Sequence, residues 1–403
     1  MLKITSFFMA VYFTVMALLG IPFSAPDLEK GEMYSAEATK EQIELFTEIY
    51  ETETAYLASM QLPNGALPMT YSKNGELTVN PYFADFAALS LLDKGEEYAD
   101  IVKGYMDWHF AHLNTAKEDF NGLDGTIYDY KVTMKNGEIV EERISTPENA
   151  DSYDTTDSYA ATFLTVVYKY YCKTGDAEYL LNNFQDLIRI ANVMLLTEQN
   201  GLTYAKPNHR VKYLMDNCEV YEGAVAASKI FEVIRQEYEI GTVSYFAEEY
   251  ENLALEVREN INSKLWNFVG GYYLPGITAY VKIPTKIFSW NTYYPQATCQ
   301  LFPIICGVID PSTDRAKNLY EKFCDTYHWE AFDYPDSFYW GANVQAAAVM
   351  NDLESVTEYM ENYKPLTEKH SWPLYNMDIA RTSMAAYMML QKADTVDGCD
   401  GMH

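Results

Sequence analysis

The chain has 403 residues, 48% of them hydrophobic, with 29 basic and 58 acidic residues and a formal net charge of −29. This length permits one large domain or roughly two to three ordinary ones, and the composition allows a sizeable core. The negative charge argues against nucleic acid, anionic lipid and strongly anionic polymers as partners. Six scattered cysteines lack CxxC spacing, so the sequence predicts no metal site and no cofactor, and it leaves open a disulfide.

The first 25 residues have the features of an export signal. Lys3 precedes an apolar run from Ile4 to Ile21, and the small residue Ala25 follows shortly after. This order of regions is typical of a secretory signal. The run is nearly long enough to cross a bilayer, so an uncleaved anchor is the alternative. We therefore expect a secreted protein, or one anchored on the outer face of the cytoplasmic membrane, with a linker at 26–38.

Helical periodicity dominates the rest of the chain and is interrupted by loops rich in Gly, Pro and Asn. It predicts helices at 39–60, 82–93, 96–113, 154–174, 177–198, 216–238, 244–266, 291–305, 313–326, 338–350, 352–363 and 377–391. Helices rich in Ala and apolar residues alternate with amphipathic helices that carry an acidic face. This alternation is typical of an inner helical ring wrapped by an outer one. We predict an all-α (α/α)6 toroid of six helical hairpins, a single monomeric domain over 39–392.

The interruptions predict smaller features at the rim of the toroid. Gly, Tyr and Val cluster at 62–79, 126–143 and 268–284, which favours short β-hairpins there. Residues 393–403 read as a flexible tail. The inner helices of a toroid point one set of their ends into a central cleft, so the residues that open these helices are the first candidates for function.

Several inner helices open with acidic and aromatic residues, most clearly in the segment Asp151–Phe163. Carboxylates at positions 151, 154 and 157 precede an almost wholly apolar helix, where unpaired charge is unfavourable. One explanation is capping, with Asp154 as the N-cap and Asp157 at the third helical position, which suits the helix dipole. The other is a catalytic cluster. We expect both, with Asp154 mainly capping and Asp157 facing the cleft.

Carboxylates among aromatic rings are what glycoside hydrolysis requires. One carboxylic acid protonates the leaving oxygen, and a second carboxylate activates water or attacks the sugar. Aromatic rings cover the apolar faces of sugars. The expected partner is therefore a carbohydrate, and the negative charge favours a neutral polysaccharide. The candidate substrate-binding residues are Tyr82, Phe83, Tyr128, Tyr153, Trp290, Trp340 and Trp372.

Three segments resemble bacterial six-hairpin glycosidases. They read Gln61-Leu-Pro-Asn-Gly-Ala-Leu, Asn80-Pro-Tyr-Phe-Ala-Asp-Phe-Ala-Ala-Leu and Asp154-Thr-Thr-Asp-Ser-Tyr-Ala-Ala-Thr-Phe-Leu. Thr156-Asp157 before an apolar inner helix is similar to the Thr-Asp opening found in glycoside hydrolase family 8. This resemblance implies that Asp157 binds the distorted sugar or the catalytic water, and that the reaction inverts the anomeric configuration.

The sequence departs from family 8 at the general acid. In that family an inner helix near the N-terminus begins Ser-Glu-Gly and its glutamate is the acid, whereas Tyr82 stands opposite that position here. Glu219 is the preferred replacement, followed by Glu222, Asp85 and Asp154. The candidate catalytic residues are thus Asp157, Glu219, Asp154 and Glu222.

Two other functions stay open at this point. Without the family-8 glutamate, the chain could be a catalytically inactive glycan-binding or exopolysaccharide-assembly protein on the same scaffold. The Asn208-His-Arg210 loop and the many tyrosines are compatible with a polysaccharide lyase, in which Tyr or His abstracts a proton beside an Arg. The acidic charge disfavours the anionic substrate of such a lyase.

Overall fold

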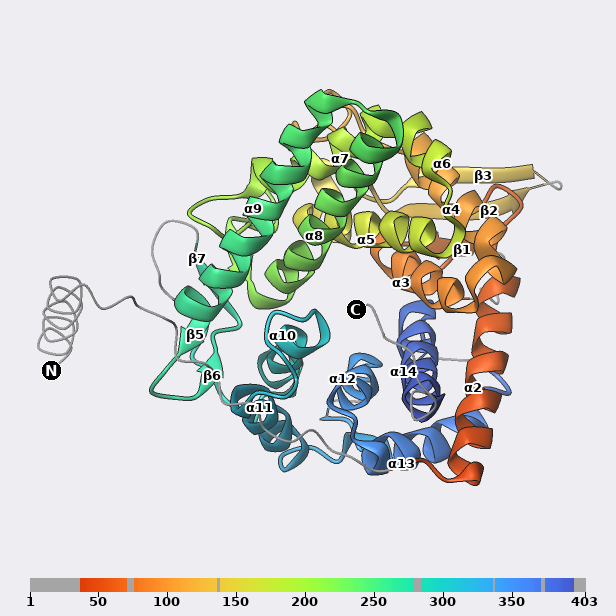
Figure 1. Ribbon diagram of the computed structural model, residues 1–403, viewed down its shortest axis with the longest axis vertical. Coiled ribbons are helices and arrows are strands. Elements are labelled where there is room, and N and C mark those ends of the chain that lie inside the picture. The colour runs from red at the N-terminus through yellow and green to blue at the C-terminus, as the bar shows by residue number, and fades with distance from the viewer. Residues whose placement is uncertain are drawn as a thin grey trace, which may run out of the picture.

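The computed structural model describes residues 37–70, 76–135, 138–278, 284–335, 338–370 and 374–394. Its helices form a closed double ring, which is the predicted (α/α)6 toroid (Figure 1). The expected export signal lies outside the described residues, as do most of the expected linker and tail. Within the described part of the chain, no helix has the length and hydropathy needed to cross a membrane.

Inner and outer helices alternate along the chain. The inner helices are α3 (Pro81–Leu91), α5 (Asp157–Thr174), α8 (Leu214–Tyr238), α10 (Phe302–Ile305), α12 (Ala342–Met350) and α14 (Asn376–Asp394). The outer helices are α2 (Lys40–Ser59), α4 (Ala99–Ala111), α6 (Ala177–Asn182) with α7 (Phe184–Thr197), α9 (Ser244–Asn260), α11 (Asp314–Cys324) and α13 (Leu353–Tyr363). Each inner helix contacts the next one around the axis, and α14 contacts α3 to close the ring.

The prediction of one helix over 291–305 was wrong. This segment consists of a π-helical turn (Tyr293–Ala297), a 3₁₀ turn (Thr298–Leu301) and the single turn of α10. Proline lacks the N–H that a helix interior needs, and it disfavours helical backbone in the residue before it. Pro295 and Pro303 therefore prevent a continuous helix, and Pro303 is accommodated in the first turn of α10.

Small residues let the inner helices approach closely. A Cβ atom built on Gly223 of α8 would lie 2.4 Å from Cα and 2.5 Å from Cβ of Ala161 on α5. No larger side chain fits at that crossing, because real atoms do not approach so closely. The alanine- and glycine-rich composition of the inner helices thus follows from the close packing of the inner ring.

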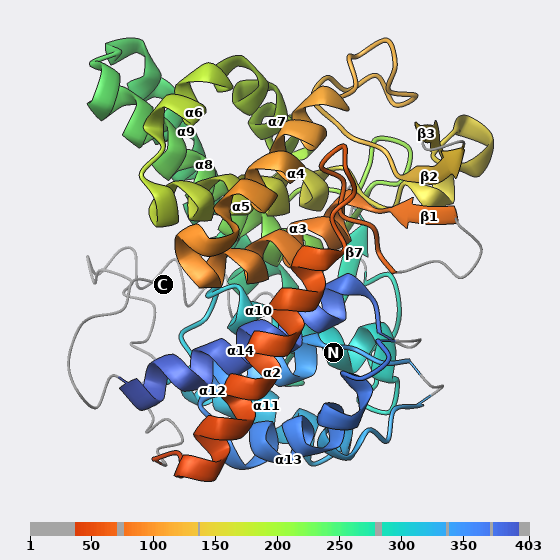
Figure 2. The same ribbon diagram turned by 90° about the vertical axis from the view of Figure 1, so that its right-hand side faces the viewer.

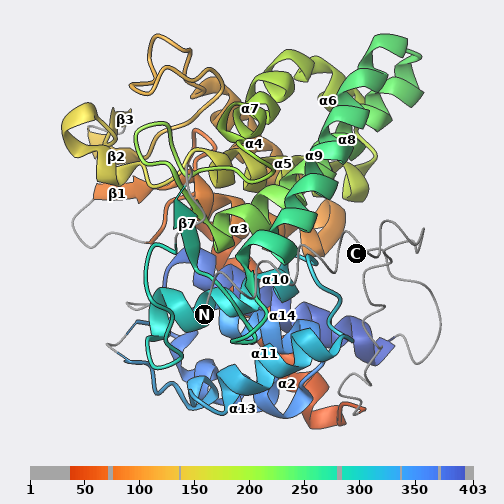
Figure 3. The ribbon, with the colours of Figure 1, turned by 90° about the vertical axis from the view of Figure 1, so that its left-hand side faces the viewer.

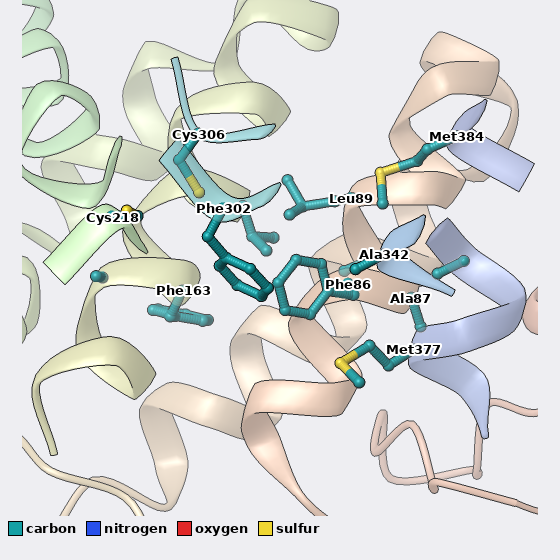
Figure 4. Close-up of a cluster of buried hydrophobic side chains, with 14 of the residues drawn as sticks. Phe86, Ala87, Leu89, Phe163, Cys218, Phe302, Cys306, Ala342, Met377 and Met384 are labelled. Atoms are coloured by element: carbon teal, nitrogen blue, oxygen red, sulfur yellow. The ribbon is translucent and has the colours of Figure 1, made fainter. Parts of the chain in front are cut away.

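Apolar side chains fill the axis of the ring. Phe86 from α3 and Phe302 from α10 face each other at its centre, among Cys218, Cys306 and Met377 (Figure 4). Both phenylalanines belong to the continuous buried core. This packing closes the middle of the toroid, so a cavity at one end of the axis has a floor.

A buried hydrogen bond between a histidine and a glutamate joins the beginning of the ring to its end. Glu53 on α2 is fully buried, and its Oε2 lies 2.5 Å from Nε2 of His370, which follows α13. The imidazole ring also stacks on Tyr56 at a centroid distance of 3.5 Å. These contacts hold the first described helix against the last hairpin.

The strands form three small antiparallel sheets in the loops. They are β1 (Glu76–Val79), β2 (Tyr130–Lys135) and β3 (Glu138–Arg143) in one sheet, β4 (Val211–Tyr213) with β7 (Gly276–Thr278), and β5 (Trp266–Asn267) with β6 (Tyr272–Tyr273). The hairpin expected at 126–143 is present as β2 and β3. The segment 62–79 contributes one strand, β1, which pairs with β2 instead of forming its own hairpin.

The strands gather where the inner helices begin. Figures 2 and 3 place β1, β2, β3 and β7 on the same face of the ring, while α14 ends on the opposite face. The inner helices run in one direction because each returns from an outer helix. Their N-termini therefore share the face that carries the strands, and the functional residues must be sought there.

Candidate functional site

A cavity of about 500 Å³ lies at the N-terminal ends of the inner helices, and five of the six helices supply described lining residues, while the loop before α12 supplies Phe338, Tyr339 and Trp340. Ligand pockets in proteins commonly have such a volume. The described residues that line it are Asn80, Tyr82, Phe83, Asp129, Asp154, Thr155, Ser158, Tyr159, Met215, Asp216, Glu219, Tyr294, Phe302, Phe338, Tyr339, Trp340, Tyr375, Met377 and Asp378. They confirm the expectation that the inner-helix openings converge.

Five carboxylates line this cavity, and no Lys or Arg does among the described residues. They are Asp129, Asp154, Asp216, Glu219 and Asp378. Helix N-termini carry a partial positive charge, which favours acidic side chains at these ends. This explains how so many acids can be accommodated together, although it does not neutralise them.

Glu219, on the second turn of α8, is the buried acid of the cavity. Its side chain is only 4% exposed, and its Oε1 accepts a hydrogen bond of 2.5 Å from the hydroxyl of Tyr82. Burial raises the pKa of Glu219 to about 8, against the lowering effects of the Tyr82 hydrogen bond and of the Arg381 charge. Glu219 therefore carries a proton at neutral pH.

Asp154 and Asp157 have exchanged the positions expected from the sequence. Helix α5 begins at Asp157 with Thr156 at the N-cap, so Asp154 does not cap it. The reason is a long-range contact, because Ala205 O accepts hydrogen bonds from the Thr156 N–H (2.7 Å) and hydroxyl (2.6 Å). These two hydrogen bonds keep the residues that precede Asp157 outside helix α5. Asp154 is consequently exposed and lines the cavity.

Asp157 lies behind the cavity wall and does not line it. It is fully buried, and its Oδ1 accepts hydrogen bonds from the Thr155 hydroxyl (2.5 Å) and from the Ser158 N–H (3.0 Å). The Thr155 hydroxyl also lies 3.2 Å from Oδ2 of Asp216. Burial raises the pKa of Asp157, and the pKa of Asp216 lies well above its usual range because of burial and the neighbouring charges of Asp157 and Glu219.

Asp129 and Asp378 complete the acidic lining on either side. Asp129 accepts hydrogen bonds from the Asn80 amide (3.0 Å) and the Tyr159 hydroxyl (3.2 Å), and burial raises its pKa to about 7. Asp378 accepts a hydrogen bond of 2.9 Å from the N–H of Gly341, and burial likewise raises its pKa to about 7. Both acids are therefore partly protonated at neutral pH.

Aromatic rings form one wall of the cavity. Tyr294 lies 4.5 Å from Phe338 and 4.6 Å from Trp340 between ring centroids. Tyr294 and Phe338 are 43% and 40% exposed, so their faces are accessible to a ligand. The buried Nε1 of Trp340 has no hydrogen-bond partner among the described residues. Of the predicted binding residues, Tyr82, Phe83 and Trp340 line the cavity.

The other predicted residues lie elsewhere. Glu222 is exposed on α8 but does not line the cavity, and Trp290 packs against Phe288 at 5.3 Å outside it. Tyr128 and Tyr153 are buried in the core and pack on each other at 5.2 Å. Their assignment as sugar platforms was wrong, because aromatic residues near a site also serve as core anchors. Trp372 lies outside the described residues.

Asp85, a further candidate for the acid, is also structural. It is fully buried on α3 and accepts hydrogen bonds from the hydroxyls of Tyr105 (2.8 Å) and Thr162 (2.6 Å). It thereby links α3 to α4 and α5. Most of the other lining residues, Asp129 and Phe338 among them, were not predicted from the sequence. Asp129 lies in a loop, where periodicity carries no signal, and Phe338 lies in the loop before α12, although the periodicity predicts a helix over 338–350.

Solved structures share this fold at low sequence identity. A glycosidase is 12% identical with a TM-score of 0.56, and the alignment covers 88% of this chain and 98% of that one. A rhamnosidase from Klebsiella oxytoca with rhamnose bound is 11% identical with a TM-score of 0.56, over 90% of this chain and 66% of that one. An α-amylase from Clostridium perfringens is 11% identical with a TM-score of 0.52, over 85% and 97%.

These likenesses establish the helical toroid found in glycosidases, and they concern the fold alone. No protein-family profile and no curated protein sequence matches the chain. The chemistry of the site must therefore be argued from the cavity itself.

Proposed function

We propose that this protein is a glycoside hydrolase that cleaves a neutral oligosaccharide or polysaccharide in the cavity. In this proposal Glu219 is the general acid and Asp154 is the general base. The observation that carries it is a buried glutamate with a pKa of about 8 in the same cavity as a solvent-exposed aspartate. Two carboxyl groups in contrasting environments are the arrangement that glycoside hydrolysis uses.

Glu219 has the properties of a proton donor. Its carboxyl group is protonated at neutral pH, and the Tyr82 hydroxyl holds Oε1. The acidic proton then resides on Oε2, from which it can pass to the leaving glycosidic oxygen. The bond from the anomeric carbon to this oxygen breaks as the proton is transferred.

Asp154 has the properties of a base for water. Its side chain is exposed, so water has access to it. It would remove a proton from the water that attacks the anomeric carbon, which gives inversion of configuration. Inversion requires the two carboxyl groups to lie roughly 6.5–9.5 Å apart, with the water and sugar between them.

The lining of the cavity supports a neutral carbohydrate as substrate. The rings of Tyr294, Phe338 and Trp340 offer apolar surface for a sugar face, and the carboxylates accept hydrogen bonds from hydroxyl groups. A uronate-containing substrate of a lyase would meet like charge, and the described lining residues include no Lys or Arg. Carbohydrates are also the ligands of two solved structures that share the fold, with rhamnose and α-1,6-mannotriose bound.

The experiment is an assay for reducing sugar released from a panel of neutral glucans, mannans and exopolysaccharides. Glu219→Gln and Asp154→Asn should each abolish release while the protein stays folded. Glu222→Gln is the matched control, since Glu222 lies one turn further along α8 and outside the cavity. Saccharide binding without turnover on any substrate would instead support a glycan-binding protein on this scaffold.

The place of action is part of the same proposal. The basic residue, apolar run and small residues of positions 1–25 support export, with secretion or anchoring on the outer face of the cytoplasmic membrane as the outcome. Sequencing the N-terminus of the mature protein distinguishes a cleaved signal from an anchor. Protein found only in the cytoplasm at full length would contradict the proposal.

A further inference from the structure

Arg381, on α14, is a buried cation immediately behind the cavity. Its side chain is 1% exposed, and its guanidinium group lies 4.0 Å from the ring centroid of Phe86 and 5.5 Å from that of Phe302. These are the two rings that face each other at the centre of the toroid (Figure 4). Since Phe302 also lines the cavity, the ring of Phe302 lies between the guanidinium and the cavity.

The guanidinium has fewer polar partners than its charge requires. Its Nη1 donates a hydrogen bond of 2.5 Å to the neutral amide oxygen of Gln345, and its Nε is buried with no partner. None of the ion pairs within 4.0 Å among the described residues involves it. A buried charge is strongly unfavourable without compensation, so the compensation must act through space.

Aromatic rings connect Arg381 to the cavity, because Phe86 lies 5.1 Å from Tyr82 between ring centroids and the Tyr82 hydroxyl donates to Glu219. The charge of Arg381 lowers the pKa of Glu219 and of Asp378, and it does the same for Glu222, one turn further along α8. Direct contact between a guanidinium and Glu219 would keep the acid ionised and unable to donate a proton. The charge of Arg381, acting without direct contact, lowers the pKa of Glu219 only in part. Burial still raises this pKa enough to leave Glu219 protonated at neutral pH.

We propose that Arg381 is a positioning residue whose buried charge acts on the Glu219 carboxyl group from behind the cavity wall, across the rings of Phe86 and Tyr82, without touching substrate. This inference rests on the proposed role of Glu219 as the acid. Charged and titratable groups also face Glu219 from other elements, and they would act on it in every variant. They are Tyr82 and Asp85 on α3, Asp157 on α5, Asp216, Cys218 and Glu222 on α8, Tyr294 before α10, and Cys306 after it.

The test measures the titration of Glu219 directly. The infrared carboxyl band that Glu219→Gln removes is followed against pH in the wild type and in Arg381→Met, which keeps an apolar side chain but no charge. We expect the midpoint to move upward by about one pH unit or more in Arg381→Met. Arg381→Lys keeps a charge and should move it less. This measurement needs no turnover, so it is independent of whether the protein proves to be a hydrolase.

Activity supplies the second readout. If Glu219 is the acid, the basic limb of the pH–rate profile should shift with the infrared midpoint in each variant. A folded Arg381→Met protein with an unchanged midpoint would overturn the proposal. Arg381→Gln serves as a second neutral variant, because its amide can still bond to Gln345. If both neutral variants fail to fold while Arg381→Lys folds, the charge serves folding instead, and the proposal is wrong.

Discussion

The hydroxyl of Tyr82 lies 2.5 Å from Oε1 of Glu219, and this hydrogen bond joins the first turn of α3 to the second turn of α8. Tyr82 stands where the resemblance to family 8 places a glutamate, and it contacts the residue that we assign as the acid. A hydroxyl that donates to a carboxylate stabilises the ionised form. Tyr82 thus lowers the pKa of Glu219 while it orients the carboxyl group.

Replacing Tyr82 by Phe should raise the pKa of Glu219 above about 8 and move the basic limb of the pH–rate profile upward. We expect kcat at the optimum to fall about tenfold, which corresponds to about 1.4 kcal/mol of barrier, because the acid loses its orienting contact. Steady-state kinetics between pH 5 and 10 measure both effects. Phe83→Leu is the matched control on the same helix, since it changes the lining but not the hydrogen bond. An unchanged basic limb in Tyr82→Phe would contradict the assignment.

Stability should fall as the pH rises from about 5 to 8. Asp129, Glu219 and Asp378 have pKa values of about 7, 8 and 7 in the folded protein, above those of unfolded carboxyl groups. The folded state therefore binds more protons in this range, and the free energy of unfolding decreases by up to about 1.4 kcal/mol per pH unit for each group. Denaturant unfolding at several pH values measures the slope.

Glu219→Gln should make that slope shallower, because glutamine is neutral in both states. Asp154→Asn provides the control, since Asp154 is exposed and its replacement removes no buried acid. An equal slope in wild type and Glu219→Gln would show that Glu219 does not stay protonated on folding.

Asp157 should act through its neighbours and not on the substrate. Asp157→Asn keeps an oxygen that can accept the Thr155 hydroxyl, so the fold should be retained and kcat should change by less than about tenfold. Asp157→Ala leaves that buried hydroxyl and the Ser158 N–H without their partner, at a cost of about 1–3 kcal/mol in stability. Kinetics and thermal unfolding of the two variants separate these effects. Complete loss of turnover in a stably folded Asp157→Asn protein would restore the direct role that the resemblance implies.

The aromatic wall should contribute to binding but not to the chemical step. Tyr294 is 43% exposed, so Tyr294→Ala should fold normally. We expect KM to rise about tenfold, equivalent to about 1.4 kcal/mol, with kcat largely unchanged. Tyr294→Phe keeps the ring and should behave like the wild type. If Tyr294→Ala bound and cleaved the saccharide as the wild type does, the prediction that the sugar packs against Tyr294 would be wrong.

The repeating pattern of helices was determined by the sequence alone. Apolar helices alternate with acidic amphipathic ones, and only a double ring buries the first kind on all sides while exposing one face of the second. Acids and aromatics at the inner-helix openings likewise indicated one shared site, because parallel inner helices bring their N-termini together. Glu219 could be named from this pattern.

Which acids reach the cavity was decided by the tertiary structure. Ala205 lies 49 residues from Thr156, and its carbonyl accepts the hydrogen bonds that make α5 begin at Asp157. As a result, Asp154 is exposed and Asp157 is buried. Loop residues such as Asp129 and Phe338 line the site because the chain folds back on itself, and helical periodicity does not predict such contacts. The pKa values depend on burial and on charges from other helices, including that of Arg381 on α14. Local sequence sets which helices form, whereas protonation and exposure follow from contacts between residues that are distant in the chain.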